Sequence, residues 1–284
     1  MGQVITVVGS VNLDLVVRCD QLPLAGETVL GDGFAKHPGG KGANQALAAR
    51  RLGASVELIG CVGNDEDAAE ALSLLRAGGV VLDRCRATAE APTGVAMIAV
   101  APDGDNQIVV ASGANAHLCL DDLPPRITGA LIGQLETPID VLAEAVSRCD
   151  GLTCLNLAPA AELPDALLRQ ADLCIVNEAE GGFYGLDRLQ AAGGLTALTL
   201  GARGAVLFEG DREIARATPP RVEAHDATGA GDTFVAALTL GLLEGQSPSQ
   251  ALEFACAAGA ASTLRAGAQP ALPMRQDVDA LLGG

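Results

Sequence analysis

The chain has 284 residues, of which 49% are hydrophobic and 19% charged, so it can bury a large core and is too apolar for a disordered protein. Acidic residues outnumber basic ones by 35 to 18, and the net charge of -17 disfavours binding to nucleic-acid phosphates or to an anionic membrane surface. No apolar run approaches the roughly 18 residues that a membrane-spanning helix needs, and the N-terminus lacks the cationic start of a signal peptide. We therefore expect a cytoplasmic protein whose partners are small molecules, with no nucleic acid and no membrane among them.

Short β-branched runs alternate along the chain with longer segments of helical periodicity. We expect strands at 3–8, 55–61, 152–157, 173–176, 195–200 and 204–208, and helices at 41–52, 65–77, 138–148, 161–170, 230–244 and 248–265. This alternation is typical of an α/β fold with a doubly wound, mainly parallel sheet and helices on both faces.

Two regions, 12–34 and 93–111, interrupt the alternation. The first contains two short strand-like runs, and the second reads as a hairpin with Asp103 and Gly104 at its turn. Neither fits a βα unit, so we expect them to form a small antiparallel β lid beside the main sheet of a single domain that spans 1–284. Such a sheet would cover the site, form a dimer surface, or do neither.

The eight cysteines lie far apart and include no C-x-x-C pair, and no histidine lies at metal spacing from two of them. In a chain of this size the pattern favours buried thiols in a reducing compartment over a disulfide framework. It also offers no plausible ligand set for zinc.

The densest chemical signal is DATGAGDTF at 226–234, a glycine-rich turn that opens a predicted helix. Such a turn leaves backbone N–H groups unpaired at the positive end of the helix dipole, and these groups bind anions such as phosphate. Asp232, in the first helical turn, has two interpretations. It either stabilises its own helix N-terminus, or it is a base that takes a proton from an attacking hydroxyl beside the phosphate site. The whole motif favours the second, because its small residues let a ligand approach the carboxylate.

A second glycine-rich turn, HPGGKGAN at 37–44, also runs into a predicted helix and places Lys41 and Asn44 on one face of its first turn. The spacing of a Walker A loop is absent, so the motif is not a P-loop. Lys36 and Lys41 are the two lysines of a sequence whose other cationic residues are arginines. This bias suggests that a compact ammonium group is needed at this turn.

Carboxylates also follow two strand-like runs. In GSVNLDL at 9–15, Asn12 and Asp14 are two residues apart and point to the same face of a strand, near the crevice where open α/β sheets bind ligands. An amide and a carboxylate there suit the neighbouring hydroxyls of a sugar, although a turn-forming Asn-x-Asp is the alternative. In QLETP, Glu136 again lies just past a strand-like run, before a proline at a predicted helix start.

The motifs GGKGAN at 39–44 and DATGAGDTF at 226–234 together resemble those of the ribokinase-like (PfkB-type) sugar kinases, and the resemblance covers essentially the whole chain. Further matching stretches are NLD at 12–14, TGVAMIAV at 93–100, SGAN at 112–115, QLETP at 134–138, LNLAPA at 155–160, NEAE at 177–180, TLGARG at 199–204 and GAQP at 267–270. Within the family, the sequence is most similar to the members that phosphorylate D-ribose. The resemblance implies transfer of a phosphoryl group from ATP to the 5-hydroxyl of D-ribose, which gives D-ribose 5-phosphate.

The same resemblance implies roles for individual residues around the sugar. Asp232 would be the general base, and the amides of Gly229, Ala230 and Gly231 would form the anion hole for the transferred phosphoryl group. The sugar would be bound by Asn12, Asp14, Gly40, Lys41, Asn44 and Glu136, together with Asp232.

The resemblance also implies where ATP and two metal ions would bind. Asn177 and Glu180 would organise Mg2+ and phosphate, mostly through water. The nucleotide would lie against Thr199, Gly201, Ala202, Gly204, Gly231 and Cys256. Potassium, as a monovalent activator, would be bound by Asp226 and Thr228 with backbone carbonyls near Ser262, Arg265, Gly267 and Ala271. In a homodimer that shares its lids, Ile108 would cover the sugar site of the other subunit.

Two departures from the family pattern leave alternatives open. The chain between Asn177 and Thr199 is short and contains GGFYG, a poor helix sequence, so we expect at least one helix to be trimmed or missing there. Cys256 stands where some relatives have a histidine or asparagine near the adenine, which affects nucleotide preference. The alternatives are a kinase of the same family for another sugar or a nucleoside, and a sugar-binding regulator without catalysis. The shortage of aromatic side chains counts against a nucleoside.

Overall fold

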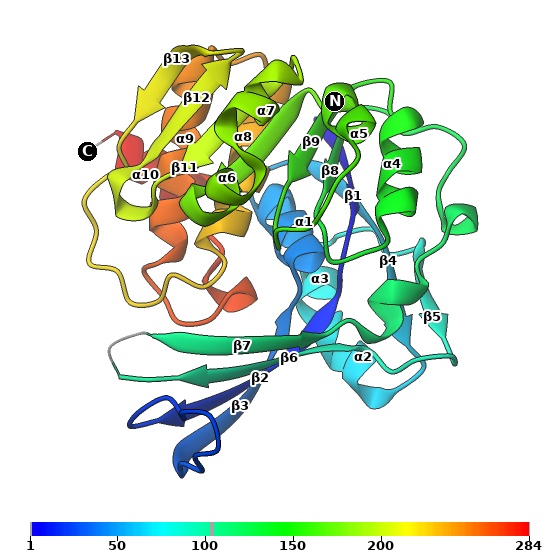
Figure 1. Cartoon of the computed structure of the whole chain (residues 1–284), viewed down its shortest axis with the longest axis vertical. Helices are drawn as coiled ribbons and strands as arrows, with labels where there is room; N and C mark the ends of the chain where they lie inside the picture. Colours follow the sequence, from blue (N-terminus) through cyan, green and yellow to red (C-terminus); the bar gives the residue numbers. More distant parts are fainter. Residues whose placement is uncertain (1, 103–104, 284) are drawn as a thin grey trace.

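The computed structural model describes residues 2–102 and 105–283, and its larger sheet has nine strands in the order β13-β12-β11-β10-β9-β8-β1-β4-β5 (Figure 1). The strands are β1 (Val4–Val8), β4 (Ser55–Gly63), β5 (Cys85–Thr88), β8 (Ala130–Gly133), β9 (Leu152–Asn156), β10 (Leu173–Asn177), β11 (Leu195–Thr199), β12 (Ala205–Glu209) and β13 (Arg212–Ala217). Neighbouring strands from β5 to β11 are parallel, and β12 and β13 join them antiparallel. The prediction of a mainly parallel α/β sheet is therefore confirmed.

Helices cover both faces of this sheet. They are α1 (Lys41–Arg51), α2 (Glu66–Ala71), α3 (Ser73–Gly78), α4 (Ile139–Ser147), α5 (Asp165–Gln170), α6 (Glu178–Tyr184), α7 (Leu186–Ala191), α8 (Ala230–Leu243), α9 (Pro248–Ser262) and α10 (Arg275–Leu282). Successive residues of a strand point to opposite faces, so Val7 packs in the core beneath α1, α8 and α9 while Val8 packs in a second core with α4 and α5. The carboxyl end of β1 thus lies between two packed layers.

The smaller sheet contains β2 (Asn12–Cys19), β3 (Gly31–Gly39), β6 (Gly94–Val100) and β7 (Asn106–Ala111), and it projects from the rest of the chain in Figure 1. Its order is β3-β2-β6-β7, with both outer pairs antiparallel and the central pair, β2 and β6, parallel. The second strand-like run of region 12–34 is GETVLGDGF, which predicts a strand from Gly26. In the structure this strand, β3, starts five residues later, at Gly31, and continues to Gly39. The predicted turn at Asp103 and Gly104 lies outside the described residues.

Two helical predictions differ in detail from the structure. The helix predicted at 65–77 is divided at Leu72 into α2 and α3, and Asp65 caps the first by accepting a hydrogen bond from the backbone N–H of Ala68. We expected a helix to be trimmed or missing between Asn177 and Thr199; none is missing, because α6 and α7 both form there, and they are short at 7 and 6 residues.

Helix α6 forms through the glycine-rich stretch because both of its ends are anchored. Asn177 and Glu180 form a capping box at its start, where each side chain accepts a hydrogen bond from the other residue's backbone N–H at 2.8 Å. At its end, the Tyr184 hydroxyl donates to the backbone oxygen of Ala161 and accepts from its N–H group. These contacts offset the low helix propensity of the two glycines.

Within 2–102 and 105–283, no helix is both long and apolar enough to cross a bilayer. The same residues contain no group of three or more histidine, cysteine or acidic side chains that could hold a metal ion. All eight cysteines are free thiols, and four of the five buried ones belong to the two cores.

Candidate active site

The turn between β3 and α1 brings the backbone close to the first residues of β2. Gly40 has φ 92°, a conformation that favours glycine, and a Cβ atom there would lie 2.7 Å from the backbone nitrogen of Asn12. A Cβ atom on Gly39 would overlap the carboxylate of Asp14. The two glycines therefore let Asp14 and the start of α1, with Lys41, occupy the same small space.

Asn12 and Asp14, at the start of β2, are buried side by side on one face of the strand. The amide of Asn115 fixes Asn12 by donating to its Oδ1 at 2.7 Å, while Asn115 also pairs with both backbone groups of Val11. Burial, followed by the negative charges of Glu136 and Asp232, raises the pKa of Asp14 to about 7, against a smaller opposing effect of Lys41. Asp14 is therefore a carboxyl group close to its titration point at neutral pH.

Glu136 links the segment after β8 to the start of α1. Its carboxylate accepts hydrogen bonds from the hydroxyl of Ser10 and, at 3.1 Å, from the backbone N–H of Lys41. A carboxylate at a helix N-terminus is stabilised by the unpaired N–H groups and the helix dipole. Glu136 is thus held at the same end of α1 that carries Lys41.

Asp232 lies in the first turn of α8, which packs against α1. Its two carboxylate oxygens accept one hydrogen bond each at 2.9 Å, from the amide of Asn44 and from the amide of Gln45. The side chain is 7% exposed. The predicted base, on α8, is therefore held in place by two side chains of α1.

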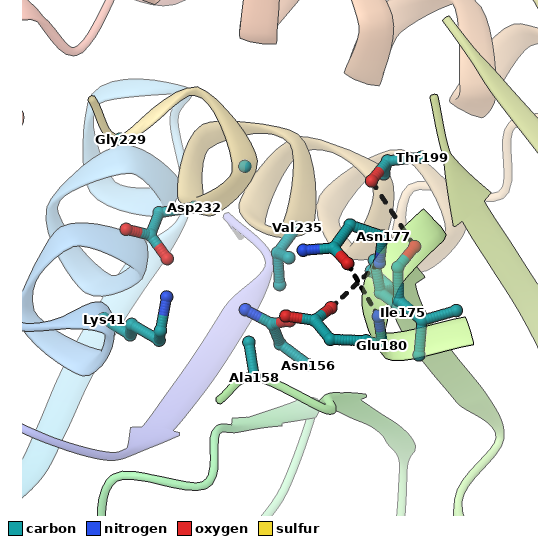
Figure 2. A pocket seen from close by; sticks show the side chains of 12 residues that line it. Lys41, Asn156, Ala158, Ile175, Asn177, Glu180, Thr199, Gly229, Asp232 and Val235 are labelled. Atoms are coloured by element: carbon teal, nitrogen blue, oxygen red, sulfur yellow. Dashed lines mark hydrogen bonds between the residues drawn. The ribbon is translucent and has the colours of Figure 1, made fainter. Parts of the chain in front are cut away.

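The Lys41 side chain points toward Asp232 across the end of the pocket (Figure 2). Burial alone lowers the pKa of this ammonium group, but the carboxylates of Asp232, Glu136, Glu180 and Asp14 together raise it. Lys41 therefore carries a positive charge that the negative charges of these four carboxylates stabilise.

A pocket of about 160 Å³ opens between α8, the carboxyl ends of β9 and β10, and the start of α6 (Figure 2). Lys41 and Asp232 lie at one end of it, and Asn177, Glu180 and Thr199 at the other. Burial raises the pKa of Glu180, partly offset by the hydrogen bonds from Asn177 and by the charge of Lys41. The pocket thus connects predicted sugar-binding residues with predicted nucleotide-binding ones.

The start of α8 provides the predicted anion site. Gly229 and Gly231 line the pocket, and Gly229 has φ 79°. The first N–H groups of a helix have no intrahelical acceptor, although the N–H of Ala230 donates to the carbonyl of Ala227 at 3.1 Å. Two of the three residues whose amides were predicted to bind the anion therefore line the pocket, and the amide of the third is engaged in the turn.

Three of the predicted cation ligands, Asp226, Thr228 and Gly267, meet in the loops before α8 and after α9. The Asp226 carboxylate accepts hydrogen bonds from the backbone N–H and hydroxyl of Thr228 and from the backbone N–H of Gly267. Burial alone would raise the pKa of Asp226, but these bonds outweigh it and lower the pKa. Of the other predicted ligands, Ser262 and Ala271 are buried and Arg265 is exposed.

Several predicted nucleotide residues lie outside the pocket. Gly201 and Ala202 are exposed in a short turn after β11, and Gly204 is buried behind them. Cys256 is 5% exposed, and its thiol faces the backbone oxygen of Ala217 at 3.8 Å. The structure therefore does not support the predicted contact between this thiol and an adenine.

The sequence interpretation missed four side chains that hold the site together, namely Ser10, Gln45, Asn115 and Gln134. Ser10, Asn115 and Gln134 stand within stretches already singled out, GSVNLDL, SGAN and QLETP, and Gln45 directly follows GGKGAN. A polar residue next to a candidate ligand was the available signal. It could not be used because the partner of each amide comes from a distant part of the chain.

This geometry agrees with the comparisons with known proteins. The family model described as "pfkB family carbohydrate kinase" matches residues 3–275. The chain belongs to the pfkB family of carbohydrate kinases. Two similar pfkB relatives are the ribokinases of Bacillus subtilis, 39% identical over 98% of this chain and 99% of the relative, and of Haemophilus influenzae, 36% identical over 98% and 97%.

Solved structures of the pfkB family show the same fold. Ribokinase from Thermotoga maritima superposes with a TM-score of 0.88 at 30% identity and covers 99% of this chain and 100% of its own. Ribokinase from Arabidopsis thaliana, solved with ribose and ATP, superposes with a TM-score of 0.86 at 29% identity over all of both chains. The large sheet and the small lid-like sheet are therefore features of a complete pfkB kinase fold.

Proposed function

We propose that this pfkB kinase is a ribokinase that transfers a phosphoryl group from ATP to the 5-hydroxyl of D-ribose. The observation that carries the proposal is that the carboxylates of Asp14, Glu136 and Asp232 lie around Lys41, beside a pocket that Lys41 and Asp232 line at one end and Asn177 and Glu180 at the other. Asn12 lies beside Asp14 on the same face of β2. The full-length similarity to ribokinases supports the choice of sugar.

The polar groups left free at the buried end suit a small polyol. Asn44 uses its amide nitrogen on Asp232, so its Oδ1 is a buried acceptor without a partner among the described residues. A sugar hydroxyl would donate to this oxygen and to the carboxylate of Asp14, and the ammonium of Lys41 would donate to a sugar oxygen. Such hydroxyls would replace missing partners, which is how a site discriminates a polyol from an apolar molecule.

Asp232 acts in this proposal as the base that accepts the proton of the 5-hydroxyl. Each carboxylate oxygen has two lone pairs, and each uses one on Asn44 or Gln45, so one lone pair per oxygen remains for the substrate. As the new bond to phosphorus forms, the amides of Gly229 and Gly231 at the start of α8 would stabilise negative charge on the transferred group. Ala230 would join them by leaving its turn hydrogen bond.

ATP would occupy the open end of the pocket, beside Thr199 and along the turn with Gly201, Ala202 and Gly204. Mg2+ would neutralise charge on its phosphates when bound. Glu180 uses one oxygen in the capping box, so its other carboxylate oxygen, which suits a hard cation, is free to hold a water ligand of the metal. Asn177 would orient this carboxylate through the same box.

K+ would bind at the loop cluster around Asp226. The lowered pKa keeps this carboxylate ionised, and its possible partners are the hydroxyl of Thr228 and backbone carbonyls near Ser262, Arg265, Gly267 and Ala271. An all-oxygen donor set of this kind suits an alkali cation. The ion would stiffen the turn that precedes α8 without contacting the sugar.

The small sheet would serve as the lid of a cytoplasmic homodimer whose subunits are each a single domain, 1–284. Its apolar side chains Met97, Ile108 and Val109 are 62%, 54% and 68% exposed, which is costly for an isolated chain. A second copy would cover them and place Ile108 over the neighbouring sugar site.

The test is ADP formation from ATP and Mg2+ with D-ribose, 2-deoxyribose, fructose, adenosine or pseudouridine, with and without K+. The proposal predicts turnover with D-ribose, stimulated by K+ and lost in Asp232→Asn. Turnover with another acceptor alone would move the substrate to another sugar or a nucleoside. Silence with all five, with ribose still bound in calorimetry, would favour a sugar-binding regulator.

A further inference from the structure

We infer that Gln45 and Gln134 form a buried amide relay that holds the Asp232 carboxylate in position, an inference that rests on the proposed role of Asp232 as the base. The Gln45 amide nitrogen donates to Asp232 at 2.9 Å, and the Gln134 amide nitrogen donates to the Gln45 carbonyl at 2.7 Å. Both glutamine side chains are completely buried. They come from α1 and from the segment after β8, so three separate parts of the chain meet at this carboxylate.

The direction of the relay follows from chemistry. An ionised carboxylate only accepts hydrogen bonds, so Gln45 must turn its NH2 group to Asp232 and its carbonyl to Gln134. With Gln45 reversed, two acceptors would face each other in a buried space. Gln134 then ends the relay, because its own oxygen has no partner among the described residues and a Cβ atom on Gly9 would overlap it. The glycine thus makes the space in which this amide is held.

The relay completes a two-point support of the base. Asn44 holds one oxygen of Asp232 and Gln45 the other, so the plane of the carboxylate cannot rotate without breaking a bond. Asn44 retains a free oxygen for the substrate, whereas Gln45 and Gln134 have no place in the pocket lining. These two glutamines are therefore positioning residues that act through Asp232 alone.

The charged groups that face Asp232 are Lys41 from α1 and Asp14 from β2, and Glu136 faces both of these. All three stay in place when a glutamine is replaced. A change in the 13C chemical shift of the Asp232 carboxyl in a glutamine variant would therefore report the loss of the relay itself.

The experiment compares Gln45→Met, Gln134→Met and the double variant, which keep side-chain length and remove the hydrogen bonds. Gln246→Met is the matched control, because this glutamine lies beyond the opposite end of α8 and its side chain donates a hydrogen bond to the nearby Glu244. Two readouts are used: the 13C chemical shift of the Asp232 carboxyl at neutral pH, assigned with Asp232→Asn, and the kcat and KM for D-ribose.

The relay predicts that Gln45→Met changes the 13C chemical shift of the Asp232 carboxyl and lowers kcat at neutral pH roughly tenfold, with KM changed little, because the base is no longer held in place. Gln134→Met has a smaller effect in the same direction, and the double variant is no worse than Gln45→Met, because Gln134 acts through Gln45. Gln246→Met changes neither readout.

The inference is overturned if the glutamine variants lose only thermal stability while the carboxyl chemical shift and kcat stay at their wild-type values. Additive effects of the two substitutions would also contradict a relay. If Gln45→Met does not fold, Gln134→Met makes the same test one residue farther from the base. A wild-type protein without sugar turnover would contradict the proposed function, whereas the carboxyl chemical shift would still test the relay.

Discussion

Around Asp232 the polar side chains are buried and bonded to one another, whereas Asn177, at the end of β10, and Thr228, in the loop before α8, are exposed. On the buried side, Asn12, Asn44 and Glu136 each have a partner from a distant part of the chain. On the open side, the bonds are mostly local, as in the capping box of α6 and the Asp226 turn. In the proposed reaction, the part that would distinguish single hydroxyls is thus assembled before substrate binds, and the part that would exchange nucleotide and ions stays accessible.

The largest expected effect comes from removing the base at the centre of the buried side. Asp232→Asn should lower kcat by roughly 10²–10⁴-fold, because proton transfer loses its acceptor while the amide still fits the space. Steady-state kinetics measure the loss, and calorimetry should show that D-ribose still binds. Turnover near the wild-type rate would show that Asp232 is not the base.

The next effect concerns recognition by the same buried side. Asp14→Ala should raise KM for D-ribose by about 10- to 100-fold, since it removes a charged acceptor of sugar hydroxyls. The matched substitution on the open side, Glu180→Ala, should leave the affinity for D-ribose in calorimetry close to wild type. An unchanged KM in Asp14→Ala would remove this residue from the sugar site.

The open side should respond to solution conditions instead. Replacing K+ by tetramethylammonium, which is too large for the Asp226 loop, should lower kcat several-fold without changing the affinity for D-ribose. In Asp226→Asn the two cations should give equal rates, because the charged ligand is gone. Equal rates in the wild-type protein would refute the cation site.

The last effect concerns stability rather than activity, and it is a pH dependence. The folded state raises the pKa of Asp14 from 3.8 to about 7, so between these values the folded protein binds more protons than the unfolded one. The contribution of Asp14 to the free energy of unfolding therefore falls as the pH rises through this range. Chemical denaturation should show Asp14→Asn gaining stability relative to wild type from pH 4 to pH 7, and a constant difference would contradict the shift.

The large sheet could be predicted from the sequence because its central strands are apolar runs separated by helices. β9, β10 and β11 lie within one residue of their predicted ends. The strands β5 and β13 were missed because their CRAT and REIARA sequences are polar and short. The parallel pairing of β2 with β6 also escaped prediction, since it depends on how two distant segments meet.

The site could be predicted in its residues more than in its bonds. The two glycine-rich motifs indicated Lys41, Asn44 and Asp232 without a structure. The support given by Gln45 and Gln134 is non-local, because α1, α8 and the end of β8 must pack before these amides meet. Cys256 is the reverse case, a residue singled out by position in the sequence that the fold buries against β13.

The central claim is tested most directly by identifying the product formed from D-ribose, ATP, Mg2+ and K+ with 31P and 13C NMR. The account predicts D-ribose 5-phosphate from the wild-type protein and, in the same time, almost none from Asp232→Asn. A phosphate on another hydroxyl, or equal product from both proteins, would contradict the proposed role of Asp232 at the 5-hydroxyl.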